Sequence, residues 1–94
     1  MKHCIIAKFN DTVTDKAAMI DHVEALFSSA PAMDGIHGHT VLRNCVDREN
    51  RYDLAIVIDM DKAALPAWDA SELHREWKSR FGSYLTSKAI FDFE

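Results

Sequence analysis

Two histidines are the residues of this chain best suited to acid–base chemistry. His3 alternates with Ile5 and Ala7 on one face of an apolar segment, and His74 lies at the edge of an apolar stripe that includes Trp77. Because imidazole gains or loses a proton near neutral pH, such a pair can act as general base and acid on an enolisable ketone or lactone. The competing interpretation is two partly buried histidines that hydrogen-bond to backbone carbonyls or acidic neighbours.

Aromatic residues on both sides of His74 have the spacing of a pocket wall or of an ordinary core. Trp77, Phe81 and Tyr84 lie along one helical stripe, and Trp68 precedes them. Apolar walls are typical of ligand pockets, whereas a stripe at helical spacing is more often plain core. Both interpretations hold if a pocket between sheet and helices is a core left partly unfilled.

The remaining histidines and the cysteines favour structural roles. His37 and His39 are expected on one strand face, but no third ligand follows at a spacing typical of metal sites, so we expect no metal. Cys4 and Cys45 lack the Cys-x-x-Cys context of redox or metal motifs. Cys4 is expected to be a small core or interface residue. The three glycines form no phosphate-binding loop.

Alternating hydropathy predicts four strands, at residues 2–9, 36–45, 52–60 and 88–94. The first is apolar on both faces, which is typical of a strand covered on two sides. The third places Leu54, Ile56 and Ile58 on one face.

Apolar residues at helical spacing predict two helices. The first is expected over residues 15–30, with Thr14 as its N-cap and Pro31 closing it. A short helical turn over 61–65 is expected to be interrupted by Pro66. The second helix is expected to begin near Asp69 or Ser71, where the stretch resembles a capping box. Its apolar stripe predicts that it continues to Tyr84.

The predicted order is βαββαβ, which is typical of an α+β ferredoxin-like plait: a four-stranded antiparallel sheet with both helices on one face. The 94 residues fit a single domain spanning 1–94. The other sheet face also carries apolar residues, and no element remains to cover it. We therefore expect a homodimer that pairs sheet to sheet.

Composition excludes several classes of protein. Asp and Glu outnumber Lys and Arg by 15 to 11, giving a net charge of −4, which argues against a nucleic-acid partner. No apolar run approaches the roughly 18 residues that a membrane helix needs, so we expect no membrane partner. The N-terminal apolar run is too short for a secretory signal. We expect a cytoplasmic protein with reduced cysteines.

Four stretches together resemble the stress-responsive dimeric α/β-barrel family, and they cover nearly the whole chain. They are Lys2-His3 with Lys8-Phe9, the run Tyr52-Asp53-Leu54-Ala55-Ile56-Val57, Ala64-Leu65 with Trp68 and His74, and Ile90-Phe91-Asp92-Phe93. The resemblance implies plaits that dimerise into a barrel with the helices outside. Plant members include stress-induced proteins and a polyketide cyclase, which works without cofactor or metal.

The resemblance also implies which residues would act. His3 and His74 match two histidines of the cyclase, and so stand as the catalytic candidates, without a cofactor. Leu54 and Trp68 stand where the cyclase has a further histidine and a tyrosine, and Ser71 replaces the first histidine of the usual His-Pro-x-His stretch. The candidate substrate-binding residues are Leu54, Trp68, Trp77 and Phe81.

Two functions follow as alternatives. In the first, each protomer binds a small, largely apolar molecule between sheet and helices. If it is an enzyme, it is a cofactor-free cyclase or isomerase that uses His3 and His74. By analogy of fold alone, a cofactor-free monooxygenase is a further alternative. In the second, the chain is a non-enzymatic stress or accessory protein whose homodimer is the functional unit.

Overall fold

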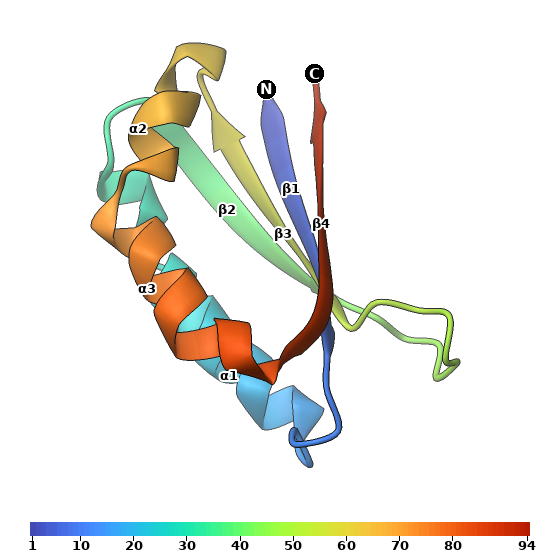
Figure 1. Cartoon of the computed structure of the whole chain (residues 1–94). Helices are drawn as coiled ribbons and strands as arrows, with labels where there is room; N and C mark the ends of the chain where they lie inside the picture. The colour runs from blue at the N-terminus through green and yellow to red at the C-terminus, as the bar shows by residue number, and fades with distance from the viewer.

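A four-stranded antiparallel sheet carries all the helices on one face in the computed structural model, which describes residues 1–94 (Figure 1). The strand order is β2-β3-β1-β4, so β1 and β3 are central. The strands are β1 (Lys2–Phe9), β2 (Ile36–Arg43), β3 (Leu54–Met60) and β4 (Leu85–Phe93). The helices are α1 (Lys16–Phe27), α2 (Leu65–Asp69) and α3 (Glu72–Phe81). The predicted ferredoxin-like fold is confirmed.

The central strands bury the faces that alternation predicts. His3, Ile5 and Ala7 on β1 are buried beneath the helices. His3 pairs with Ile58 of β3 and Ile5 with Ile56, so the apolar side chains of the two strands lie side by side. This register directs His3 toward the helices, which is the face that a pocket between sheet and helices requires.

Helix α1 begins one residue later than predicted. Asp15, and not Thr14, is its N-cap, since the Asp15 carboxylate accepts a hydrogen bond of 3.0 Å from the Ala18 backbone N–H. The helix ends at Phe27, before the predicted end at residue 30. Pro31 lies in a separate 3₁₀ turn, Ala30–Ala32, and so does not itself close the helix.

Pro66 begins a helix where an interruption was predicted. A 3₁₀ turn, Lys62–Ala64, leads into α2, and Pro66 occupies its first turn, where a backbone N–H has no helical partner. Ser71 is the N-cap of α3, and its Oγ accepts a hydrogen bond from the His74 backbone N–H. This confirms Ser71 and not Asp69 as the cap. The helix ends at Phe81, so Tyr84 lies in the 3₁₀ turn Gly82–Tyr84.

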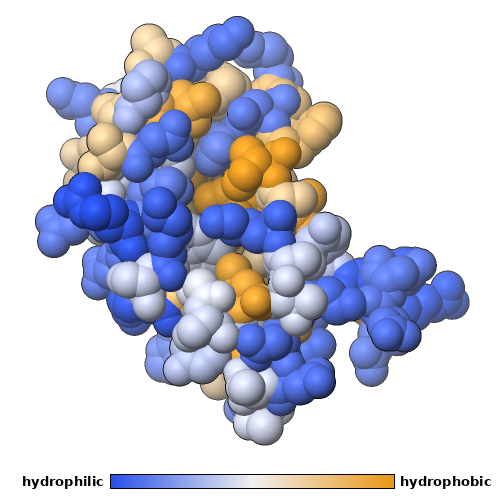
Figure 2. All heavy atoms as spheres, in the orientation of Figure 1, coloured by the Kyte–Doolittle hydropathy of each residue, from blue (hydrophilic) through white to orange (hydrophobic).

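The loop between β2 and β3 is longer than predicted, because β2 ends at Arg43 and β3 begins only at Leu54. It projects beyond the sheet and presents hydrophilic residues (Figures 1 and 2). By contrast β4 begins at Leu85, three residues before its predicted start.

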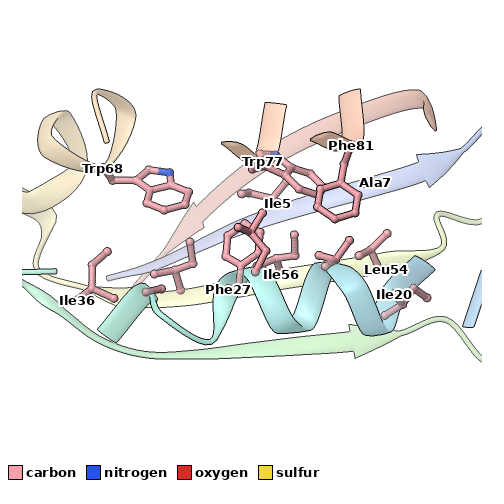
Figure 3. Close-up of a cluster of buried hydrophobic side chains, with 14 of the residues drawn as sticks. Ile5, Ala7, Ile20, Phe27, Ile36, Leu54, Ile56, Trp68, Trp77 and Phe81 are labelled. Carbon is pink, nitrogen blue, oxygen red and sulfur yellow. The ribbon is translucent and has the colours of Figure 1, made fainter. Parts of the chain in front are cut away.

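The core is a cluster of 17 buried residues between the helices and the sheet (Figure 3). Trp68 of α2 and Trp77 of α3 both pack against Phe27 of α1, with ring centroids 5.9 and 5.6 Å away. These contacts attach all three helices to one aromatic cluster. None of the helices has the length and apolarity needed to cross a membrane.

The opposite face of the sheet carries apolar side chains that no element of the chain covers. Phe91 and Phe93 of β4 are 62% and 42% exposed, and Leu42 of β2 is 52% exposed. Phe91 lies opposite Cys4 of β1, so the face that carries Phe91 continues from β4 onto β1. We call this surface the outer face. An apolar face of this kind is typical of an interface.

Candidate functional site

A cavity of about 400 Å³ opens between the β1–β4 side of the sheet and helices α2 and α3. We call it the histidine cavity, because it contains both candidate histidines. Its lining residues are His3, Ile5, Leu65, Asp69, His74, Trp77, Lys78, Lys88, Ile90 and Asp92. Figure 2 shows hydrophobic atoms between the helices and β4, bordered by hydrophilic ones. The volume lies within the range of about 300–1,000 Å³ typical of small-molecule sites.

His3 is held by an acidic partner on the neighbouring strand. The register places His3 directly opposite Asp92 of β4, on the same face of the sheet. His3 Nδ1–H donates to Asp92 Oδ1 at 2.5 Å. A carboxylate on Nδ1 fixes the tautomer of a neutral imidazole and leaves Nε2 as the acceptor.

His74 is held in the same tautomer by the backbone. It lies in the first turn of α3, and its Nδ1–H donates to the Asp69 carbonyl at 2.9 Å. The Ser71 cap fixes this turn. Asp69, Ser71 and His74 therefore form one short junction between α2 and α3 that orients the imidazole.

Neither Nε2 has a protein partner. The Nε1 of Trp68 is the one fully buried side-chain nitrogen or oxygen without a hydrogen bond. Since Nε2 of His3 and of His74 also lack hydrogen-bond partners, both atoms must retain contact with solvent. Both histidines thus line one cavity, and each has a ring nitrogen without a protein partner.

The four predicted substrate-binding residues lie in different places. Trp77 lines the histidine cavity. Trp68 is fully buried next to it, with ring centroids 6.3 Å from His3 and 5.2 Å from His74. Leu54 and Phe81 lie in the core and not on the cavity wall.

Sequence reasoning missed the polar residues around the two histidines. Asp92, Asp69, Lys78 and Lys88 all line the cavity, as does the half-exposed Ile90. Ile90 and Asp92 are two residues apart on the last predicted strand and so share a face, but the sequence alone does not show which face that is. Only the antiparallel register with β1 shows that it meets His3.

The other histidines lie away from this cavity. His37 Nε2 and Asp61 Oδ1 are 2.8 Å apart at the surface. A register shift between Ile36 and Gly38 breaks the alternation that was expected to place His37 and His39 on one face. No three metal-ligating side chains gather anywhere in the structure.

The two cysteines differ in environment. Cys4 is buried and Cys45 is exposed, and neither forms a disulfide. Burial raises the pKa of the Cys4 thiol, and the negative charge of Asp92 raises it further. Because the thiolate is the reactive form, Cys4 is an unreactive packing residue, as its sequence context predicts.

A larger hollow of about 700 Å³ lies between α1 and the β2–β3 loop. Both of its cationic side chains are paired: Lys16 pairs with Asp53, whose carboxylate also accepts a hydrogen bond from the Phe9 backbone N–H. Arg43 pairs with Asp21 and Glu24. These contacts tie the loop and β2 to α1, and no histidine lines this hollow.

Solved structures with the same fold come from several organisms. A dimeric ferredoxin-like protein of unknown function from Bacteroides fragilis is 18% identical, with a TM-score of 0.82 over 99% of this chain and 93% of that one. A second dimeric ferredoxin-like protein of unknown function, from Thermobifida fusca, is 22% identical to this chain, with a TM-score of 0.81 over 98% of this chain and 87% of that one. A hydroxynitrile lyase from Passiflora edulis is 11% identical, with a TM-score of 0.76 over 98% and 89%.

At these identities the likeness establishes the fold alone. Among curated proteins no similar sequence is found. The family described as the stress responsive A/B barrel domain matches residues 1–94, which is the whole chain. The chain therefore belongs to the stress-responsive A/B barrel family.

Proposed function

We propose that this protein is a homodimer in which each protomer binds a small, largely apolar molecule in the histidine cavity. His3 and His74 act on that molecule as an acid–base pair, without a cofactor. The observation that carries the proposal is the pairing of two imidazoles in one cavity, each with Nδ1 held by an oxygen and Nε2 without a protein partner.

The chemistry follows from the tautomers. His3 Nε2 takes the proton from the carbon next to a carbonyl, and the imidazolium that forms is stabilised by the Asp92 carboxylate. His74, when protonated, gives a proton from Nε2 to the carbonyl oxygen. The product of this step is the enol. Return of the proton from His3 to a different carbon, with loss of the enol O–H proton to His74, gives isomerisation. If the molecule has a second carbonyl, the enol carbon instead attacks that carbonyl carbon, the carbonyl oxygen takes the proton from His3, and the enol O–H proton returns to His74, which gives cyclisation.

The walls favour an apolar substrate. Ile5 and Trp77 form buried surface inside the cavity, and Leu65 and Ile90 add apolar surface nearer the mouth. Ile90 is 50% exposed, so part of this apolar surface is in contact with water. A bound apolar molecule would remove that surface from water.

The homodimer is supported by the uncovered outer face and by the dimeric structures that share the fold. The histidine cavity lies on the helix side of the sheet, so sheet-to-sheet pairing leaves it open. The hydroxynitrile lyase supports the view that this fold can carry an enzyme. A cytoplasmic location and a role in stress response complete the proposal, in line with two unpaired cysteines and the family's description.

The test is ligand binding to the variant His3→Gln/His74→Gln, measured by calorimetry with acetophenone as an apolar ketone. We expect binding to wild type and a loss of about tenfold or more in affinity in the variant, since charge-capable hydrogen bonds contribute about 1.5–3 kcal/mol. The control is His22→Gln, at an exposed position on α1, which should bind as wild type does. If His3→Gln/His74→Gln binds acetophenone as tightly as His22→Gln does, His3 and His74 do not contribute to binding, and the non-enzymatic dimer is favoured instead.

A further inference from the structure

The indole N–H of Trp68 is a buried hydrogen-bond donor without an acceptor. Trp68 has no exposed surface, and its Nε1 has no hydrogen-bond partner. Buried polar groups in folded proteins are nearly always paired, so an exception calls for an explanation. No other fully buried side-chain nitrogen or oxygen in the structure lacks a partner.

The unpaired donor lies beside the histidine cavity. The Trp68 ring packs against both His3 and His74, which line the cavity. Figure 3 shows the Trp68 indole extending from its helix into the core toward Ile5 and Trp77, which are also lining residues. The indole therefore forms the layer directly behind the cavity wall.

The position of the indole is fixed by its own backbone. The Trp68 carbonyl accepts hydrogen bonds from the Ser71 hydroxyl at 2.7 Å and from the Ser71 backbone N–H at 3.0 Å. The ring is also packed against Phe27. A donor held this firmly keeps its direction when the cavity fills, which is what a recognition group needs.

We propose that Trp68 Nε1–H donates a hydrogen bond to the carbonyl oxygen of the bound molecule. This inference rests on the proposed function and specifies it. The ligand is an apolar compound whose carbonyl enters first and lies between the two imidazoles, with its remaining chain directed toward Lys78 and Lys88 at the mouth. Because Trp68 has no exposed surface, this contact requires the partly buried His74 ring to move aside from its hydrogen bond with the Asp69 carbonyl when the ligand binds.

The first test uses two probes that differ only at the recognised atom. Acetophenone has a carbonyl oxygen where α-methylstyrene has a methylene group. In ¹H–¹⁵N spectra of the wild-type protein, acetophenone should move the Trp68 indole proton downfield and α-methylstyrene should not. The Trp77 indole is the competing donor, because it lines the cavity and its N–H also has no hydrogen-bond partner in the protein. A shift specific to acetophenone at Trp77 and not at Trp68 would overturn the inference.

The second test is Trp68→Phe, which removes the donor and keeps an aromatic ring. Affinity for acetophenone should fall about two- to tenfold, which is the effect of one lost hydrogen bond. Affinity for α-methylstyrene should not fall with it. Trp77→Phe is the matched control, since the same change there should weaken both probes to the same extent. The wild-type spectra stand even if Trp68→Phe fails to fold.

The outcomes separate this inference from the proposed function. If both probes bind and shift the His3 and His74 signals, but the Trp68 indole responds equally to each, the donor role is wrong and the cavity remains a binding site. If neither probe shifts the histidine signals, the histidine cavity is not the site, and both proposals fall together.

Discussion

At the residue scale, the chemistry depends on which nitrogen of each imidazole carries the proton. His3 and His74 both have Nδ1 directed at an oxygen, one from a carboxylate and one from a backbone carbonyl. Two unrelated local structures, a strand pair and a helix N-terminus, thus give the same tautomer. The shared tautomer of two histidines that line one cavity is the feature that favours the proposed acid–base role over a packing role.

A first prediction concerns these tautomers. Long-range ¹H–¹⁵N spectra above neutral pH should find both rings protonated at Nδ1, while the exposed His22 on α1 serves as the unconstrained reference. In Asp92→Asn the tautomer of His3 should become mixed, because an amide can donate as well as accept. The tautomer of His74 should not change in that variant. Protonation of His3 at Nε2 in wild type would remove the proposed base.

A second prediction concerns Cys4. Burial and the charge of Asp92 hold the pKa of its thiol above the ordinary value of 9.0. Native structure thus favours the neutral thiol, so this contribution to stability is present below about pH 9 and is lost as pH rises further. Denaturation at pH 8 and pH 10 should give a smaller loss of stability for Cys4→Ala than for wild type. The exposed Cys45 should react with a thiol reagent long before Cys4.

The positions and contacts of the site residues could be predicted from the sequence only in part. Alternation placed His3 on one face with Ile5 and Ala7, but it could not show which face that is, because the first strand is apolar on both sides. Asp92 could not be assigned to His3, because pairing across an antiparallel ladder depends on register, which is set by contacts along both strands. Trp68 was predicted as apolar wall, and its unpaired N–H became visible only once its surroundings were known.

At the scale of elements, the α2–α3 junction positions the site. It carries Trp68 behind the cavity and His74 in its wall, and Ser71 connects the two. Its sequence has a proline at the start of α2 and a serine cap before α3, both of which suit helix beginnings.

A third prediction tests this junction through Ser71→Ala. The change removes the cap of α3 and the hydrogen bond to the Trp68 carbonyl, so it should lower the free energy of unfolding by about 1 kcal/mol. It should also weaken ketone binding, since His74 loses its fixed turn. The control is Ser79→Ala on the exposed side of the same helix, which should change stability by less than about 0.5 kcal/mol. An effect on stability alone would leave the junction without a role in the site.

Element types were predicted well, and their ends less well. The strand alternation and helical stripes reflect burial on one face, which sequence records directly. Ends depend on local hydrogen bonds: Asp15 displaced Thr14 as a cap by accepting from Ala18, and Gly82 and Tyr84 formed a 3₁₀ turn in place of more helix. Pro66 was predicted to interrupt a helical turn, because proline disrupts a helix interior. Proline also suits the first turn of a helix, and that is where Pro66 lies in α2.

At the scale of the whole molecule, the two faces of the sheet differ. The helix-facing side holds the core and the histidine cavity, and the outer face carries the uncovered apolar side chains that the proposed homodimer would bury. A chain of 94 residues buries a modest fraction of its surface, so burial of the outer face in a dimer would add stability that the single protomer lacks.

A fourth prediction tests the use of the outer face. Phe91→Glu places a charge on it, and in a symmetric interface the charge is buried twice, so the dimer should weaken by about a hundredfold or more. Sedimentation should then find monomers at concentrations at which wild type is dimeric. Tyr84→Glu is the matched control, because Tyr84 is exposed but lies outside the sheet, and it should remain dimeric. A dimeric Phe91→Glu protein would place the interface elsewhere.

The central claim is that His3 and His74 act together on one bound molecule, and a ligand titration monitored through the five histidine ring signals tests it most directly. The signals are assigned with single His→Gln variants and followed as acetophenone is added at a fixed pH. We predict that the ketone moves the His3 and His74 signals together while those of His22, His37 and His39 stay unchanged, and that replacing either His3 or His74 weakens the response of the other. No response of the His3 and His74 signals to the ketone would contradict the account.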